Sequence, residues 1–193
     1  MPSDSQVPIA SATPPEKGTE WLLLIYKIPP EPTRLRAGAW RRLKSLGAVY
    51  LQNSVAAFPR TPASERALRK LRHDIIEMSG TAVLTQTTVL AGEETILSLF
   101  QAARTDEFDE IVDRCEGFLE EIQKEYDKSH FSYAELEENE VDYTKLANWF
   151  AKVCERDHFG ADGRSAAQAA LERCERSLED YAARVYAEEP EGH

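Results

Sequence analysis

The first apolar run of the chain, Trp21-Leu-Leu-Leu-Ile-Tyr-Lys-Ile28, ends abruptly at Pro29-Pro30 and constrains the fold more than any other segment. A near-continuous apolar run of this length is typical of a buried strand. Proline has no main-chain N–H group to give to a strand ladder, so residues 29–32 must form a loop. The sequence therefore predicts a central strand at residues 20–28, with Lys27 near its C-terminal end.

The segments after this strand predict a complete small domain. Thr33 is a candidate cap for a helix that reaches about Leu46, and two short strands are predicted at residues 48–52 and 54–59. Thr61-Pro62 marks the start of a second helix that reaches about Ser79, and the β-branched residues of 81–90 predict a fourth strand. This order of elements is that of the ferredoxin-like βαββαβ fold, in which both helices cover one face of the sheet.

Residues 92–187 are predicted to be helical throughout, because apolar residues recur at helical spacing. The middle helix has two candidate caps, Ser132 and Asp142, and the acidic run between them favours Asp142; Asp162 is the candidate cap of the last helix. The steps of four and three between apolar residues in the last helix are typical of antiparallel helix packing. We therefore expect an α+β protein with a disordered tail at residues 1–18, a ferredoxin-like module at 19–91, an antiparallel α-helical module at 92–187, and a short tail at 188–193.

The charge is divided unevenly between these modules. Residues 1–90 contain 12 Lys and Arg against 7 Asp and Glu, whereas residues 91–193 contain 11 against 27, which together give the net charge of −11. A basic half can attract anions, and an acidic half repels nucleic acid. The sequence has no apolar run near the roughly 20 residues of a membrane helix, no signal-peptide pattern and no disulfide framework among its 3 cysteines, so we expect a cytoplasmic protein that does not contact membranes.

The basic residues of the first module are the candidate binding site for nucleic acid or for another anion. Lysine and arginine side chains gathered on one module can contact phosphates or a small oxyanion. The plainer interpretation is a solvated helix surface, or one that docks the acidic helices of this chain or of a second subunit. The candidates are Lys27, Arg34, Arg36, Arg41, Arg42, Lys44, Arg60, Arg69 and Lys70.

The sequence offers few other sites. Cys154 and His158 are four residues apart in a predicted helix, a spacing that can chelate a metal ion, although all three cysteines also fit the apolar stripes of their helices and a core role is the plainer interpretation. A thiol that reports an oxidant is a further alternative. The chain has no Gly-rich phosphate loop, no His-Glu-x-x-His and no Gly-x-Ser-x-Gly, so we expect neither an enzyme nor a cofactor.

Five segments of the chain together resemble the N-terminal domain of the ChrB family of chromate-resistance proteins. They are Trp21–Pro29, Arg36–Val49, Gln52–Pro59, Phe159–Arg164 and the helix that contains Cys174 and Tyr181. The resemblance covers residues 20–187 and implies a regulator that responds to chromate or another oxyanion and acts on DNA at a chromate-efflux operon. Full-length relatives carry a second, C-terminal domain, which we expect this chain to lack.

A more distant similarity concerns the end of the first strand. The first strand, helix and strand pair resemble the small CRISPR-associated nucleases of ferredoxin-like fold, which hold a metal ion with an aspartate near the end of that strand. Lys27 stands at the corresponding position here, and a lysine cannot ligate Mg²⁺ as a carboxylate does. The leading hypothesis is therefore a non-enzymatic, homo-oligomeric transcriptional regulator, most simply a dimer, that binds DNA or an oxyanion. The alternatives are a homo-oligomeric interaction module without DNA binding and a redox accessory protein that handles an oxyanion.

Overall fold

The computed structural model describes residues 18–188, and these divide into two compact units with the boundary between Leu97 and Ser98. Apart from Gly18 and Glu188, the tails predicted at residues 1–18 and 188–193 lie outside the described residues.

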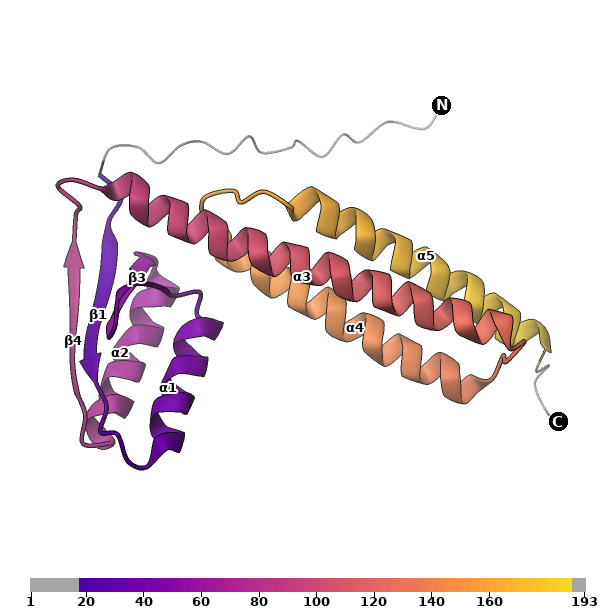
Figure 1. Cartoon of the computed structure of the whole chain (residues 1–193), viewed down its shortest axis with the longest axis horizontal. Coiled ribbons are helices and arrows are strands. Elements are labelled where there is room, and N and C mark those ends of the chain that lie inside the picture. Colours follow the sequence, from indigo (N-terminus) through magenta and orange to yellow (C-terminus); the bar gives the residue numbers. More distant parts are fainter. Residues whose placement is uncertain (1–17, 189–193) are drawn as a thin grey trace. The chain divides into compact units, whose positions relative to one another are not determined.

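The first unit is built from six elements in the order that the sequence predicts. They are β1 (Trp21–Lys27), α1 (Thr33–Ser45), β2 (Val49–Gln52), β3 (Val55–Pro59), α2 (Pro62–Glu77) and β4 (Thr81–Thr87). The strands form one antiparallel sheet in the order β2-β3-β1-β4, and α1 and α2 lie on the same face of it (Figure 1). The α+β, ferredoxin-like prediction is confirmed, with element ends that differ from the expected ones by up to three residues.

Alternation along β1 determines which side chains enter the core. Leu22 and Leu24 point to the helix-covered face and are buried with Leu43 of α1 and Leu68 of α2. This burial removes apolar surface from water and is the main source of stability in the first unit.

The start of α1 differs from the prediction. Pro32, and not Thr33, occupies the N-cap position, with extended backbone angles (φ −76°, ψ 138°) and no side-chain cap. The carbonyl oxygen of Pro32 accepts the first turn's hydrogen bond from the main-chain nitrogen of Leu35 at 3.0 Å. The fixed φ of proline suits this position, so Thr33 becomes the first helical residue. In α2 the predicted cap is confirmed, because the Thr61 side chain accepts from the Ser64 nitrogen at 3.0 Å.

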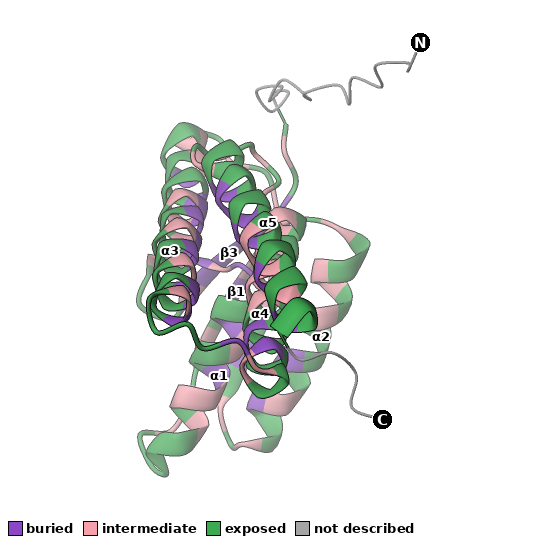
Figure 2. Ribbon diagram, turned by 90° about the vertical axis from the view of Figure 1, so that its right-hand side faces the viewer, coloured by how far each residue is buried: buried purple, intermediate pink, exposed green. Residues whose placement is uncertain are grey.

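The second unit is formed by three helices, α3 (Glu93–Asp127), α4 (Tyr133–Arg156) and α5 (Arg164–Glu188), of which α3 begins before the boundary. Their buried residues follow one side of each helix (Figure 2). The largest fully buried side chains of this core are Phe108, Ile111, Ile122, Val153 and Tyr181. The predicted helical periodicity in residues 92–187 therefore corresponds to a shared core.

Two predicted helix starts in this unit are wrong. Ser132 caps α4, since its hydroxyl accepts from the Glu135 nitrogen at 3.3 Å, and Asp142 lies inside the helix, where its carboxylate accepts from Lys145 at 2.7 Å. The acidic run is compatible with helix because glutamate is a good helix former. α5 begins at Arg164, and the Gly163 carbonyl oxygen accepts from the Ala167 nitrogen at 2.9 Å, so Asp162 is not its cap.

Along residues 18–188, every helix is either too short or too polar to cross a membrane.

A candidate anion-binding groove

The end of β1 opens into a groove of about 910 Å³ in the first unit. Three segments line it: the end of β1 with the residue that follows, the outer side of α1, and the β2–β3 hairpin. The lining residues are Tyr26, Lys27, Ile28, Thr33, Arg36, Ala37, Trp40, Tyr50, Asn53 and Ser54.

The local sequence explains why these segments meet. The prolines after Ile28 end β1 and turn the chain directly into α1. The β2–β3 hairpin is held beside the end of β1 by a hydrogen bond of 2.9 Å from the Tyr26 nitrogen to the Ser54 carbonyl oxygen. Ser54 itself has a positive φ of 68°, which closes the tight turn. The groove is therefore a direct product of how the first strand ends.

The charge of the groove is positive. Lys27 and Arg36 both line it, and within residues 18–188 neither forms an ion pair. No aspartate or glutamate is among the lining residues. Two cations without a carboxylate partner are a favourable surrounding for an anionic group.

An aromatic side chain lies beside these cations. Trp40 follows Arg36 by one helical turn and is 51% exposed. The Lys44 ammonium nitrogen, another turn along, is 5.6 Å from the centre of the Trp40 ring. A large exposed indole between two cations can stack on a planar ligand, such as a nucleic-acid base.

Neutral hydroxyl and amide groups complete the lining. The hydroxyls of Tyr26 and Tyr50 are 3.2 Å apart. Burial, with a smaller contribution from the bond to Tyr26, raises the pKa of Tyr50 far above its ordinary value, so this hydroxyl stays protonated at neutral pH. Together with Thr33, Asn53 and Ser54 they provide hydrogen-bond donors and acceptors but no charge.

The other predicted cations divide into two groups. Arg42 pairs with Asp74 and so links α1 to α2, whereas Arg60 and Arg69 both contact Glu65 in the first turn of α2. These arginines already have carboxylate partners inside the unit. The predicted residues that remain without an ion pair in the described part of the chain, outside the groove, are Arg34, Arg41, Lys44 and Lys70.

The aromatic residues of the groove were not among the predicted site residues. A signal for one of them is present in the sequence, because Arg36, Trp40 and Lys44 follow each other in steps of four and therefore share one helix face. The partnership of Tyr26 with Tyr50 has no such signal, since it depends on the pairing of strands that are far apart in sequence.

The predicted metal pair is arranged differently from the expectation. α4 ends at Arg156, and Asp157 leaves helical geometry with ψ at 72°, so Cys154 and His158 do not share a helix face. Burial raises the pKa of the Cys154 thiol and lowers that of the His158 imidazole. The reason for expecting a chelating pair at this place is thus removed.

The sequence of the chain matches one known protein family over most of its length. The family described as "Protein ChrB, N-terminal" matches residues 36–192. The chain belongs to this ChrB family. No curated protein matches the chain. Membership of the ChrB family associates the protein with chromate resistance. The match includes Arg36 and Trp40 of the groove, whereas Lys27 precedes it.

Proposed function

We propose that this ChrB-family chain is a non-enzymatic regulator of chromate resistance that binds DNA through the groove at the end of β1. The observation that carries the proposal is the pair Lys27 and Arg36, which lacks carboxylate partners within the described residues and lies next to the exposed Trp40. Lysine and arginine contacts to phosphates supply essentially all of the sequence-independent affinity in protein–DNA complexes.

The extent of the basic surface favours a polymer over a small ion. Arg34 and Arg41 lie further around α1 and add positive charge outside the groove itself. A small oxyanion is bound most tightly in an enclosed site with converging donors, whereas a nucleic-acid backbone needs charges spread over a surface. Both arginines are exposed and lie outside the groove lining, so the positive charge of α1 is not confined to the groove, which supports DNA as the principal ligand.

The experiment is a binding titration with the full chain. A labelled duplex from the region upstream of the chain's own gene, and a random duplex of the same length, are titrated at 50 and 200 mM salt and followed by fluorescence anisotropy. We expect tight binding at low salt that weakens steeply at high salt. The double variant Lys27→Ala with Arg36→Ala should lose about tenfold or more in affinity and show a smaller salt dependence.

A matched variant separates a local effect from one of net charge. Arg176 is exposed on α5 in the acidic unit, so Arg176→Ala removes the same charge per residue without touching the groove. It should bind DNA like the wild type. Absence of any binding at 50 mM salt, or an equal loss in the Arg176 variant, would contradict the proposal. Competition by millimolar chromate would show that the same groove also accepts an oxyanion.

The role of Trp40 can be tested separately. Base stacking contributes about 1–3 kcal/mol and requires an unpaired base. Trp40→Ala should therefore weaken the binding of a single-stranded oligonucleotide by roughly tenfold, and that of the duplex much less. Trp40→Phe, which keeps an aromatic face, is expected to restore most of the lost affinity for the single strand.

A further inference from the structure

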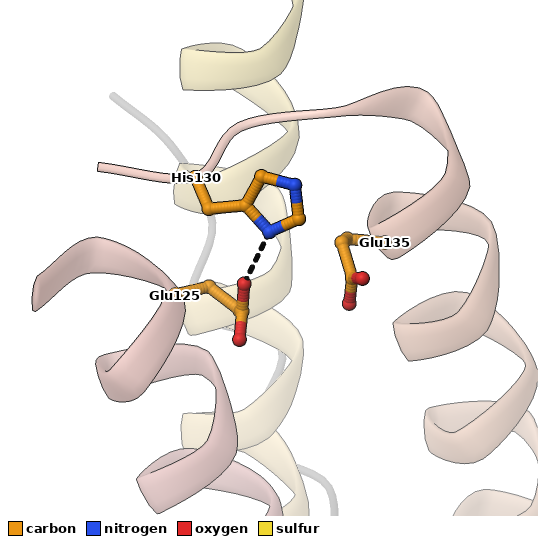
Figure 3. Close-up of side chains that lie close together, drawn as sticks. All are labelled: Glu125, His130 and Glu135. Carbon is orange, nitrogen blue, oxygen red and sulfur yellow. Dashed lines mark hydrogen bonds and ion pairs between the residues drawn. The ribbon is translucent and has the colours of Figure 1, made fainter. Parts of the chain in front are cut away.

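Three metal-ligating side chains converge at the connection between α3 and α4, in the second unit (Figure 3). Glu125 lies in the last turn of α3, His130 in the connection, and Glu135 in the first turn of α4. One ligand atom from each lies within 4.8 Å of the other two. The closest pair is the His130 Nδ1 and the Glu125 Oε2, at 2.7 Å.

The backbone that carries these side chains is fixed by contacts of its own. The His130 nitrogen donates to the Glu125 carbonyl oxygen at 2.9 Å, and Ser129, with a φ of 53°, makes the turn that this bond requires. The fully buried Tyr181 of α5 donates its hydroxyl to the His130 carbonyl oxygen at 2.9 Å. The side chains of His130 and Glu135 are therefore presented by an ordered frame that does not depend on them.

The buried carboxylate of this cluster is in an unusual place. The Glu125 side chain is only 6% exposed, and it lies at the C-terminal end of a helix, where the carbonyl dipoles disfavour an anion. Hydrogen bonds compensate it: those from Lys128 and then His130 lower its pKa. The Lys128 ammonium nitrogen lies 2.7 Å from Oε1 of Glu125, and the second oxygen, Oε2, faces the His130 imidazole.

We infer that Glu125, His130 and Glu135 bind one divalent transition-metal ion, with Zn²⁺ as the best fit. An imidazole nitrogen with two carboxylate oxygens suits first-row ions better than Mg²⁺ or Ca²⁺, which prefer oxygen ligands alone. The ion takes the place of the hydrogen between His130 Nδ1 and Glu125 Oε2, and the carboxylate of Glu135 is the third ligand. Lys128 keeps its bond to Oε1 as an outer partner.

The distances agree with this arrangement. Ligands at about 2.0–2.2 Å from a tetrahedral or octahedral ion lie roughly 3.0–3.5 Å from each other. The pair at 2.7 Å therefore has to widen by roughly 0.3–0.8 Å, and Glu135 has to approach by a change of side-chain rotamer. The His130 side chain is 50% exposed, so an ion and its remaining water ligands can reach the site from solvent. Bound there, the ion joins the end of α3 to the start of α4.

The test is metal binding by the full chain, and it does not rest on the proposed DNA-binding function. Calorimetric titration with ZnCl₂ should give one ion per chain, and MgCl₂ should bind far more weakly. His130→Ala and Glu135→Gln should each lower the Zn²⁺ affinity by at least about tenfold, since even the loss of an outer partner commonly costs that much. Zn²⁺ should also raise the unfolding temperature of the wild type but not of His130→Ala.

Matched variants identify the site. His158→Ala and Cys154→Ser remove the metal pair expected from the sequence, and His73→Ala removes an exposed histidine of α2; all three should bind Zn²⁺ like the wild type. His130→Ala keeps the main-chain bonds that hold the connection, and an unchanged circular dichroism spectrum verifies its fold. Equal Zn²⁺ affinity in the wild type and His130→Ala, or loss of binding in His158→Ala, would overturn the inference.

Discussion

Trp21 donates a hydrogen bond of 2.8 Å from its indole nitrogen to the Glu93 carboxylate, which joins the first residue of β1 to the first residue of α3. The Trp21 side chain is fully buried, so the loss of this bond would not be compensated by a direct exchange for bulk water. Glu93→Ala should lower the free energy of unfolding of the first unit by about 1–2 kcal/mol. Glu93→Gln should lower the free energy of unfolding by less than Glu93→Ala, because its amide oxygen can still accept the hydrogen bond. Urea unfolding followed by circular dichroism measures both, and equal stabilities of the two variants would contradict the importance of this bond.

Gly80 is predicted to tolerate no side chain. A Cβ at this position would lie 2.6 Å from the Lys27 carbonyl oxygen and 2.8 Å from the Ile75 carbonyl oxygen, both parts of the rigid backbone. Gly80→Ala should therefore destabilise the first unit by about 1–3 kcal/mol, the usual cost of overpacking. It would also disturb the end of β1 and with it the groove.

Gly38 gives the matched control for this prediction. It lies inside α1, and a Cβ there would meet nothing within 4 Å. Gly38→Ala should raise the stability by up to about 1 kcal/mol, because alanine loses less backbone entropy in a helix. Thermal unfolding of the two alanine variants should shift in opposite directions, and a stable Gly80→Ala protein would show that β4 can move away from Lys27.

The cysteines bear on the redox alternative. Burial raises the pKa of Cys174 to about 12 and also raises that of Cys115. The thiolate is the reactive form, so both thiols should be nearly inert at neutral pH. We expect iodoacetamide at pH 8 to label the folded chain far more slowly than the chain unfolded in urea. Rapid labelling of Cys174 in the folded protein would restore a thiol mechanism as a serious candidate.

The same shift predicts a pH dependence of stability. The folded chain holds the Cys174 proton more tightly than the unfolded chain, whose thiol has an ordinary pKa of 9.0. The contribution of the protonated Cys174 thiol to the free energy of unfolding is thus complete below pH 9, and it is lost as the pH rises from there toward about 12. Cys174→Ala should flatten the decline in unfolding free energy between pH 9 and 11, measured by urea unfolding, and an unchanged slope would contradict the assignment.

The fold was largely predictable because its signals are local. The prolines after Ile28, the capping residue Thr61 and the alternation along β1 each act within a few residues, and together they determine the βαββαβ order. The site was only partly predictable. Lys27 and Arg36 were expected on charge alone, whereas the ion pairs that remove Arg42 and Arg60 from the available cations depend on contacts across the fold. The predicted start of α4 is wrong because the sequence offers two capping residues, Ser132 and Asp142. A side chain that is able to cap a helix does not prevent the residues before it from being helical.

Glu107 is predicted to be the most sensitive carboxylate of the second unit. It lies 2.8 Å from the guanidinium of Arg104 and 3.0 Å from that of Arg156, and Arg104 is only 4% exposed. Burial already lowers the pKa of Arg104, and the charge of Arg156 adds to this. Glu107→Ala would leave two neighbouring cations without this carboxylate, so it should destabilise the unit by about 3–5 kcal/mol, the usual cost of breaking a buried ion pair.

Glu110, one turn further along α3, is the control for Glu107. Its carboxylate is 3.9 Å from Arg114, and both side chains are exposed. Exposed pairs of this kind contribute at most about 1 kcal/mol, because water and salt screen them. Glu110→Ala should therefore unfold at nearly the same urea concentration as the wild type, while Glu107→Ala unfolds at a clearly lower one. Similar midpoints for the two variants would mean that solvent reaches Arg104 and Arg156 and compensates for the lost carboxylate.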